Sequence, residues 1–375
     1  MLQRLMRLGA ASSTATREGR GPEYDVDAVI TALYRAALER EPDAAGFAAK
    51  KRWLRKGGTL DRLVQEILDS GEFRAKVLAK LIPSSTLPDL RLISPENYRS
   101  ETTAYGETMT VFVAETDADF DRMEGLIAQH RYYDVPGVWG TQIDRDKKIT
   151  AAIARGLGAR TCLELGCFTG PVLSLLATAG LAVTGLDASH LAFALAYPEI
   201  RDRMVFGDLL SAHLTGPYDL ILAMDILEHL NPAKLGAYVD RIVGLLAEDG
   251  YLYLNSPMFG EDDVFGTPFP AYIAEWQSVG DESYWRHLDC DARGWPKHGH
   301  LVWASPTWWE ELFRARGLVR DRVVERAIHR RLESFFAENP GRRSLFVLHR
   351  EGNRRASGKV ADRVVAVIDA IDEAV

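Results

Sequence analysis

A short stretch rich in ionisable side chains, "DILEH", follows an apolar run and contains Asp225, Glu228 and His229. At positions i, i+3 and i+4, these side chains can converge where a strand turns into a helix. A later stretch adds further imidazoles, among them His298 and His300. Such a set can supply a general base that removes a proton, or it can surround a divalent cation. A purely structural role, with Glu228 in a first helical turn and His229 hydrogen-bonded in the core, is the third interpretation.

A glycine-containing loop, "CLELGCFTG", runs from Cys162 to Gly170. Gly166 and Gly170 allow the backbone to pass close to a ligand that a Cβ atom would push away. Asp187 ends the next apolar run and is placed to accept hydrogen bonds from ribose hydroxyls. These features fit either a dinucleotide or S-adenosylmethionine (SAM).

Three residues help to decide between a dinucleotide and SAM as the ligand. A dinucleotide loop has a glycine that makes room for pyrophosphate, and here Phe168 stands in that place. Glu164 would repel phosphates, but it suits a ligand that carries an ammonium and a sulfonium group. Asp208, in "FGDLL" after the third predicted strand, can accept a hydrogen bond from an adenine amino group. The pattern therefore favours SAM over a dinucleotide.

The elements that must position these residues alternate between strand and helix from Arg160 onward. Apolar strand candidates are "TCLELG", "LAVTGLD", "MVFGD", "YDLILAMD" and "GYLYLNS", and the segments between them have helical periodicity. Pro171 and Pro232 occupy first helical turns, which accept proline. This alternation predicts a doubly wound α/β fold, with the ligand beyond the carboxyl ends of the strands.

The set of motifs resembles the class I SAM-dependent methyltransferases over about Arg160 to Arg350. The matching pieces are E-L-G-x-x-x-G at Glu164–Gly170, the acids Asp187 and Asp208, and "YDLILAMDILEH". The resemblance implies a Rossmann-like, mostly parallel seven-stranded sheet. It also implies a set of cofactor-binding residues, which are Glu164, Gly166, Cys167, Phe168, Gly170, Asp187, Ala188, Asp208, Leu209 and Met224. Phe168 departs from the commoner family glycine.

The acid-x-x-Glu-His pattern with a later histidine resembles the magnesium-dependent O-methyltransferases. That resemblance implies that Asp225, Glu228, His229 and either His298 or His300 bind Mg²⁺ or another divalent cation, and we take His298 as the fourth ligand. The metal would lower the pKa of the hydroxyl to be methylated. Here the first acid is Asp rather than Glu, which shortens its reach. The metal-free interpretation assigns catalysis to His229, Glu228, Asp225 and His300.

The N-terminal part has helical periodicity throughout residues 25–82, with Asp43 and Thr59 as predicted caps. Its landmarks "LYR", "REPD" and "SGEF" resemble the phycobilisome-linker-like helical module of unknown function. That module occurs in bacterial surface-associated and glycan-handling proteins. The resemblance implies docking to a protein partner or self-association, and it implies no catalysis.

The composition limits which partners and which cellular compartment can be expected. The 375 residues carry a net charge of −8 and lack a Lys/Arg cluster with interleaved aromatics, so neither DNA nor RNA is expected as a partner. No apolar stretch approaches the length of a membrane span. The cysteines Cys162, Cys167 and Cys290 are odd in number, which favours a reducing, cytoplasmic setting. We expect a disordered leader (1–22), a small all-α module (23–82), a linker (83–116), a methyltransferase domain (117–350) and a C-terminal helix (351–375).

The sequence thus predicts a SAM-dependent methyltransferase. The expected reaction is O-methylation of a hydroxyl on a small-molecule or glycan acceptor of the sugar or glycoconjugate type, in glycan biosynthesis. Methylation of a small aromatic or polyketide-like metabolite is the alternative within this class. A non-catalytic SAM-binding adaptor is the alternative of another class.

Overall fold

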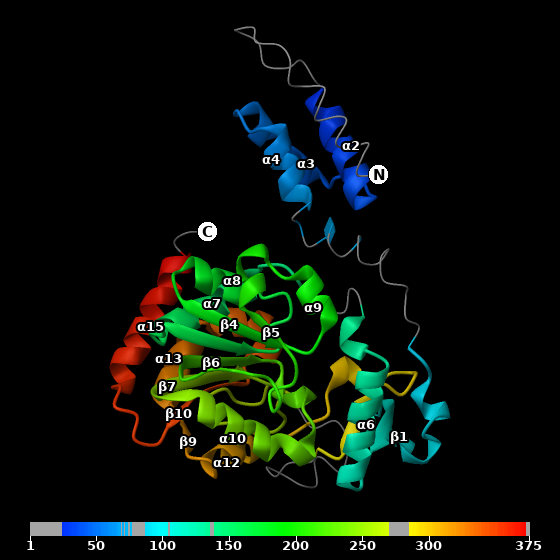
Figure 1. The fold of residues 1–375 in the computed structure, drawn as a ribbon, viewed down its shortest axis with the longest axis vertical. Coiled ribbons are helices and arrows are strands. Elements are labelled where there is room, and N and C mark those ends of the chain that lie inside the picture. Colours follow the sequence, from blue (N-terminus) through cyan, green and yellow to red (C-terminus); the bar gives the residue numbers. More distant parts are fainter. Residues whose placement is uncertain are drawn as a thin grey trace. The chain divides into compact units, whose positions relative to one another are not determined.

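The protein is described from a computed structural model that covers residues 25–68, 70, 72–73, 76, 87–103, 106–135, 139–269 and 285–372 (Figure 1). The chain divides into two compact units, Met1–Leu81 and Ile82–Val375. The predicted leader, 1–22, and most of the predicted helical residues after Leu68 lie outside the described residues. Within the described part, no helix combines the length and the apolar composition needed to cross a membrane.

The first unit consists of helices α2 (Val26–Leu38), α3 (Ala44–Arg55) and α4 (Leu60–Leu68) in its described part. The Asp43 carboxylate accepts a hydrogen bond from the Gly46 amide, as expected of a helix cap. The Thr59 hydroxyl likewise accepts from the Arg62 amide. One apolar core joins the helices, formed by Ile30, Tyr34, Leu38, Leu54, Leu63 and Ile67. The helical prediction is confirmed here, whereas membership of the linker-like module stays a prediction.

The second unit is built on a seven-stranded sheet in the order β5-β4-β3-β6-β7-β10-β9. The strands are β3 (Thr161–Leu165), β4 (Ala182–Asp187), β5 (Met204–Phe206), β6 (Tyr218–Met224), β7 (Leu246–Asn255), β9 (Leu318–Arg320) and β10 (Leu345–Arg350). Strands β5, β4, β3, β6 and β7 pair in parallel, and β10 pairs antiparallel with both of its neighbours. The predicted doubly wound, mostly parallel sheet of seven strands is confirmed.

Helices cover both faces of this sheet because its strands are apolar on both sides. In β6, Leu220 and Leu222 face one core, while Ile221 and Ala223 face the other. The first core is covered by α7 (Arg145–Gly156), α8 (Pro171–Thr178), α13 (Arg322–Arg331), α14 (Glu333–Glu338) and α15 (Ser357–Asp372). The second is covered by α10 (Leu235–Leu245) and α12 (Pro306–Arg314) (Figure 1). The short helix α9 (His190–Leu195) follows β4.

The C-terminal helix α15 packs on its own chain, since it contacts α7 and α13. A Cβ atom added at Gly156 would lie 2.5 Å from the Cα atom of Val364, so the two helix backbones approach closely. The helix predicted over 351–375 is therefore part of the second unit rather than a separate segment.

A second, three-stranded sheet of order β1-β2-β8 lies in the same unit, with strands β1 (Tyr98–Thr102), β2 (Thr108–Val113) and β8 (His287–Cys290). Helix α6 (Asp117–Gln129) shares a core with it through Phe112, Phe120 and Leu288. The prediction that residues 83–116 are only a linker is wrong for β1 and β2. The polar sequence of β1 and the distance of β8 along the chain explain why no local pattern revealed this sheet.

Short 3₁₀ turns complete the fold, and several of them border the site described below. They are η1 (Leu90–Leu92), η2 (Pro95–Asn97), η3 (Tyr132–Asp134), η4 (Pro198–Arg203), η5 (Leu227–His229), η6 (Pro232–Lys234), η7 (Lys297–Gly299) and η8 (Pro340–Arg342). The three cysteines, Cys162, Cys167 and Cys290, are buried and free.

Candidate functional site

The glycine loop leaves β3 in a left-handed conformation. Gly166, Phe168 and Gly170 have φ angles of 63°, 44° and 75°. Added Cβ atoms would lie 2.5 Å from the Ile226 side chain at Gly166 and 2.4 Å from the Ile200 side chain at Gly170. These glycines are therefore required by conformation and by space, whereas Phe168 adopts the same region at a cost of roughly 1–2 kcal/mol.

Asp187 holds the glycine loop from the end of β4. Its Oδ2 atom accepts the Phe168 amide at 2.8 Å, and its Oδ1 atom accepts the Ser189 amide at 2.7 Å. Burial raises the pKa of Asp187, and these two amide donors oppose the rise. Two short backbone contacts thus fix the carboxylate at the edge of the sheet where ligands bind in this fold.

A cavity of about 1160 Å³ opens at this edge. Its wall includes nine of the residues singled out from the sequence, namely Gly166, Phe168, Asp187, Ala188, Asp208, Leu209, Met224, Asp225 and His229. A smaller recess of about 110 Å³ adds Glu164 and Cys167. Gly170, Glu228, His298 and His300 line neither space. The larger cavity exceeds the roughly 300–1,000 Å³ that usually holds one ligand.

Glu164 is 5% exposed, and its Oε2 atom has no hydrogen-bond partner. Burial raises the pKa of Glu164 to about 8, the nearby Asp187 adds to the rise, and Lys147 opposes it. A buried carboxyl oxygen without a partner costs free energy, which a cationic ligand group would recover.

Asp208 lies on the cavity wall after β5. Its carboxylate accepts hydrogen bonds from the Leu210 amide and from the Tyr238 hydroxyl, both at 2.8 Å. Tyr238, on α10, also lines the cavity. The tyrosine thereby sets the direction of the carboxylate that the sequence assigned to an adenine edge.

Asp225 does not join Glu228 and His229. It has a φ angle of 52° and pairs with Arg342, whose Nη1 atom also donates to the Asn255 side chain at 3.0 Å. Residues 227–229 form a 3₁₀ turn rather than the start of an α-helix, and the group of possible ligands that includes Glu228 and His229 leaves Asp225 out. The structure therefore separates Asp225 from the other two predicted ligands.

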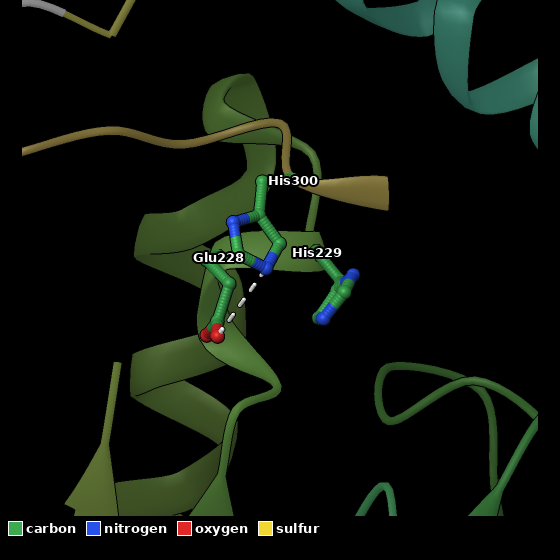
Figure 2. Close-up of side chains that lie close together, drawn as sticks. All are labelled: Glu228, His229 and His300. Carbon is green, nitrogen blue, oxygen red and sulfur yellow. Dashed lines mark ion pairs between the residues drawn. The ribbon is translucent and has the colours of Figure 1, made fainter. Parts of the chain in front are cut away.

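Glu228, His229 and His300 come together instead, with one potential ligand atom of each within 4.8 Å of the others. Figure 2 shows His300 entering from the loop after η7 and pointing toward the Glu228 carboxylate, with His229 beside them. The His300 Nε2 atom lies 4.0 Å from Glu228 Oε1. Glu228 is fully buried, and its Oε2 atom accepts the Ser256 hydroxyl at 3.0 Å, while Oε1 has no hydrogen-bond partner.

Burial shifts the protonation of this cluster toward neutral forms. It raises the pKa of Glu228 well above the usual range, lowers that of His229 to about 4, and lowers that of His300 well below 6.5. The His229 Nδ1 atom lies 3.1 Å from the Gly299 carbonyl oxygen, which can only accept. The neutral imidazole therefore carries its proton on Nδ1 and keeps a lone pair on Nε2.

His298 is exposed, and its ring centroid lies 5.6 Å from that of His300, outside the three-residue cluster. Its φ angle of 56° and that of Gly299, 76°, bend the chain sharply at η7. This bend brings the Gly299 carbonyl to His229. Aromatic rings complete the surroundings, with those of Tyr133 and Trp139 at 5.7 and 5.9 Å from that of His229.

Residues 141–322 match a family model described as a methyltransferase domain. This segment is therefore similar to methyltransferase domains, over just under half of the chain. It contains the glycine loop, Asp187, Asp208 and the whole Glu228–His229–His300 cluster. The order of the seven strands and the single antiparallel strand β10 agree with the class I methyltransferase fold that the motifs implied.

Three solved methyltransferase structures are similar to this chain, each at less than 20% sequence identity. The 1,6-didemethyltoxoflavin-N1-methyltransferase of Burkholderia thailandensis is 18% identical, with 58% of this chain and 89% of that chain covered and a TM-score of 0.38. The amino pentose methyltransferase CalS10 of Micromonospora echinaspora is 19% identical, with 60% and 96% covered and a TM-score of 0.37. The CcbJ methyltransferase of Streptomyces caelestis is 17% identical, with 57% and 98% covered and a TM-score of 0.36. A comparison with curated protein sequences finds no match.

Several residues of the candidate site were not found from sequence. Lys147 and Tyr238 line the cavity from helices α7 and α10, where they follow ordinary helical patterns. Arg342 lines both spaces from η8, beyond the matched segment. The basic residues of "DRDKK", ahead of the glycine loop, were the available sign of a cationic group near the ligand. They did not distinguish Lys147 from Arg145 or Lys148.

The donor set of Glu228, His229 and His300 fits a divalent cation. One carboxylate and two imidazoles are ligands that several such cations accept, and the buried Glu228 Oε1 atom lacks another partner. Asp225 and His298, which the sequence placed among the ligands, lie outside this set among the described residues.

Proposed function

We propose that the chain is a SAM-dependent O-methyltransferase that acts on a hydroxyl of a sugar or glycoconjugate-type acceptor. The observation that carries the proposal is that Asp187 and the glycine loop share one cavity of about 1160 Å³ with His229. Cofactor-binding groups and a proton acceptor thus face the same space, which is large enough for two ligands.

The cofactor side offers a separate partner for each polar part of SAM. Glu164 suits the ammonium group, Asp187 the ribose hydroxyls, and Asp208 the adenine amino group. When bound, SAM supplies an electrophilic methyl group on its sulfonium. Phe168 narrows the loop where a dinucleotide would need room, which favours SAM over a nicotinamide cofactor.

His229 is the group best placed to accept the hydroxyl proton of the acceptor. It lines the cavity, and its contact with Gly299 leaves Nε2 as the proton-accepting atom. Because burial lowers the pKa of His229 to about 4, the imidazole is neutral near pH 7 and available as a base. Glu228 and His300 would then orient the site from behind His229.

A metal-assisted form of the reaction uses the same side chains differently. Glu228, His229 and His300 would hold a divalent cation, which would lower the pKa of the acceptor hydroxyl. In that form His229 is a ligand and no longer the base. The unpaired Glu228 Oε1 atom favours the metal, whereas the Gly299-bound tautomer of His229 serves either form.

The proposal of a sugar-type acceptor rests on the aromatic side chains near His229. Tyr132, Tyr133 and Trp139 line the cavity. Flat aromatic faces with polar edges suit the apolar faces of sugar rings. The resemblance of the N-terminal unit to a module of glycan-handling proteins supports the same class, by association alone.

The test combines binding with turnover. Calorimetry should show binding of S-adenosylhomocysteine (SAH) and none of NAD. Labelled SAM should then transfer its methyl group to members of a panel of sugars, glycoconjugates and phenols, assayed with and without EDTA. Loss of activity with EDTA and recovery with Mg²⁺ or Mn²⁺ supports the metal form, and indifference to EDTA supports His229 as base. Binding of SAH without transfer across the panel would favour the non-catalytic adaptor instead.

A further inference from the structure

The 3₁₀ turn η3 contacts both the cofactor side and the histidine side of the large cavity. Its three residues, Tyr132, Tyr133 and Asp134, all line that cavity. The ring of Tyr132 stacks on Trp295, in the core shared by the three-stranded sheet and α6, with the ring centroids 5.4 Å apart. The ring centroid of Tyr133 lies 5.7 Å from that of His229. Two of the three side chains of η3 therefore belong to the histidine side.

The third side chain of η3, that of Asp134, contacts the cofactor side. Its Oδ1 atom accepts hydrogen bonds from the Ser189 hydroxyl at 2.8 Å and from the Leu191 amide at 3.0 Å. The same hydroxyl lies 3.2 Å from the Tyr133 carbonyl oxygen. Ser189 is the N-cap of α9 and is 2% exposed, so this contact is buried at the start of that helix. Asp134 thus attaches η3 to the first turn of α9.

The Asp134 carboxyl is ionised at this contact. Burial tends to raise the pKa of Asp134, but the Leu191 amide, the Ser189 hydroxyl and Arg131 together lower it below its ordinary value. The Oδ2 atom accepts the Arg131 Nε atom at 2.7 Å, and the Arg131 side chain is 62% exposed. Exposed ion pairs contribute little to stability, whereas hydrogen bonds to a charged and mostly buried oxygen are strong. The two bonds of Oδ1 are therefore the main attachment of η3 to α9.

Ser189 connects this attachment to the carboxylate proposed to bind the ribose. The Ser189 amide donates to Asp187 Oδ1 at 2.7 Å, while its hydroxyl donates to Asp134. A short series of contacts therefore begins at Asp187, passes through Ser189 and ends on η3. The Tyr133 ring of η3 then borders the space beside His229. A ligand that holds Asp187 thus fixes one end of the series, and the other end shapes the wall beside the proposed base.

We propose that Asp134 is a positioning residue that couples cofactor binding to the attachment of η3, and through η3 to the acceptor side of the cavity. The inference rests on the proposed function and deepens it, because Asp134 belongs to none of the cofactor motifs and precedes the matched residues 141–322. Coupling between two sites is reciprocal. A ligand at Asp187 therefore stabilises the attached η3, and the attached η3 strengthens binding of that ligand by the same factor.

The first test measures hydrogen exchange of the η3 backbone in the full chain, with and without SAH. The Val135 amide donates to the Tyr132 carbonyl at 3.3 Å, so its exchange rate reports the opening of this turn. Saturating SAH should slow this exchange by about tenfold in the wild type, a coupling of ordinary size. In Asp134→Ala, the Val135 amide should exchange faster without SAH, and addition of SAH should slow it by less than about twofold.

The second test measures the reciprocal quantity by calorimetry. Asp134→Ala should weaken SAH binding by about tenfold, the factor by which SAH slows exchange in the wild type. Asp134→Asn keeps a side-chain oxygen that can accept from Ser189 and Leu191, so it should recover part of both effects. Asp202→Ala changes an exposed acid on η4 and should behave as the wild type in both measurements. Thermal melting checks that each variant is folded, and Asp134→Asn carries the test if Asp134→Ala unfolds.

Two results would overturn the coupling. One is a Val135 exchange rate that SAH leaves unchanged in the wild type. The other is equal slowing in the wild type and in Asp134→Ala, which would mean that SAH acts on η3 without Asp134. Both results leave the proposed function standing, since the wild-type protein still binds SAH. A wild-type protein that does not bind SAH would overturn the proposed function itself and the inference with it.

Discussion

The two sides of the large cavity are built in different ways. On the glycine-loop side, Gly166, Phe168 and Asp187 lie at the ends of two adjacent strands, and the Phe168 amide donates a hydrogen bond to the Asp187 carboxylate. On the histidine side, His229 contacts Gly299, which lies 70 residues away along the chain, and Tyr133, which lies 96 residues away. The first side is thus specified locally, and the second is assembled from distant segments.

Because the two sides are built differently, cofactor binding and turnover can be changed separately by mutation. The glycine-loop side depends on backbone geometry that the sheet imposes, so it suits a cofactor that stays the same. The histidine side depends on side chains from η3, η5 and the loop after η7, and such loops can vary without disturbing the sheet. We therefore expect mutations on the first side to change binding and mutations on the second to change turnover.

The largest effect is expected on the histidine side. His229→Ala should reduce kcat by about a hundredfold to ten-thousandfold, the usual contribution of a positioned base, while SAH affinity stays within about twofold. Initial rates with an acceptor from the panel, together with calorimetry, measure both quantities. His213→Ala, an exposed histidine, is the matched control. An unchanged kcat in His229→Ala would remove this residue from the chemistry.

The next effect is expected on the glycine-loop side. Asp187→Ala should weaken SAH binding by about a hundredfold or more, because two hydrogen bonds to a buried carboxylate are lost. The substitution also frees the Phe168 and Ser189 amides, so melting without ligand must be measured beside calorimetry. Asp202→Ala, on the exposed turn η4, should have no effect. Similar SAH affinities for Asp187→Ala and the wild type would show that the ribose does not bind here.

A pH dependence should distinguish the cofactor side further. The pKa of Glu164 is about 8 in the free protein, so below pH 8 the group is mostly protonated. A bound ammonium favours the carboxylate, so binding releases a proton and SAH affinity should rise by about tenfold per pH unit from pH 6 toward pH 8. Glu164→Gln should flatten this profile. Calorimetry in buffers of different ionisation enthalpy measures the proton release.

The raised pKa of Glu164 also makes the stability of the unliganded protein decrease as the pH rises. The folded pKa of Glu164 lies above its ordinary value of 4.5, so between these values the folded state binds more protons than the unfolded state. Its contribution to stability is therefore complete below about pH 4.5 and is lost as the pH rises through about 8. Thermal melting should show a larger gain in Tm for Glu164→Gln at pH 8 than at pH 6, and equal gains would contradict the shift.

The smallest effect is expected at Phe168. Phe168→Gly should relieve the left-handed backbone and leave the amide that donates to Asp187, so SAH affinity should change by less than about tenfold. Phe168→Ala removes the ring but keeps the strain and serves as the comparison. If NAD bound to Phe168→Gly and not to Phe168→Ala, the backbone at this position would be what excludes a dinucleotide.

Prediction from sequence succeeded where the residues that could bind the cofactor directly follow successive strands along the chain. The strands, the glycine loop and the acids Asp187 and Asp208 follow one another in a fixed order, and the sheet brings their ends to one edge. Prediction was weaker where a partner comes from elsewhere. Asp225 was expected beside Glu228, but Arg342 from η8 holds it apart, and nothing near "ENPGRR" indicated that role.

The three-stranded sheet shows the same limit at the level of the fold. Strand β2 pairs with β8 through Thr110 and Cys290, residues separated by most of the second unit. Local alternation in such short strands is too weak to predict a pairing over that distance. The bend at η7, which places His300 and not His298 in the cluster, follows β8 along the chain, and no local pattern predicted it either.

The close approach of α15 to α7 has a practical meaning for anyone who wishes to shorten this chain. Gly156 and Val364 leave no gap between the two helices, and α7 is also the helix from which Lys147 extends. Cutting the protein where the family match stops would strip an apolar cover from that helix and loosen a wall of the ligand pocket. The smallest fragment worth expressing therefore runs to the end of α15, and fusion tags belong at the other terminus.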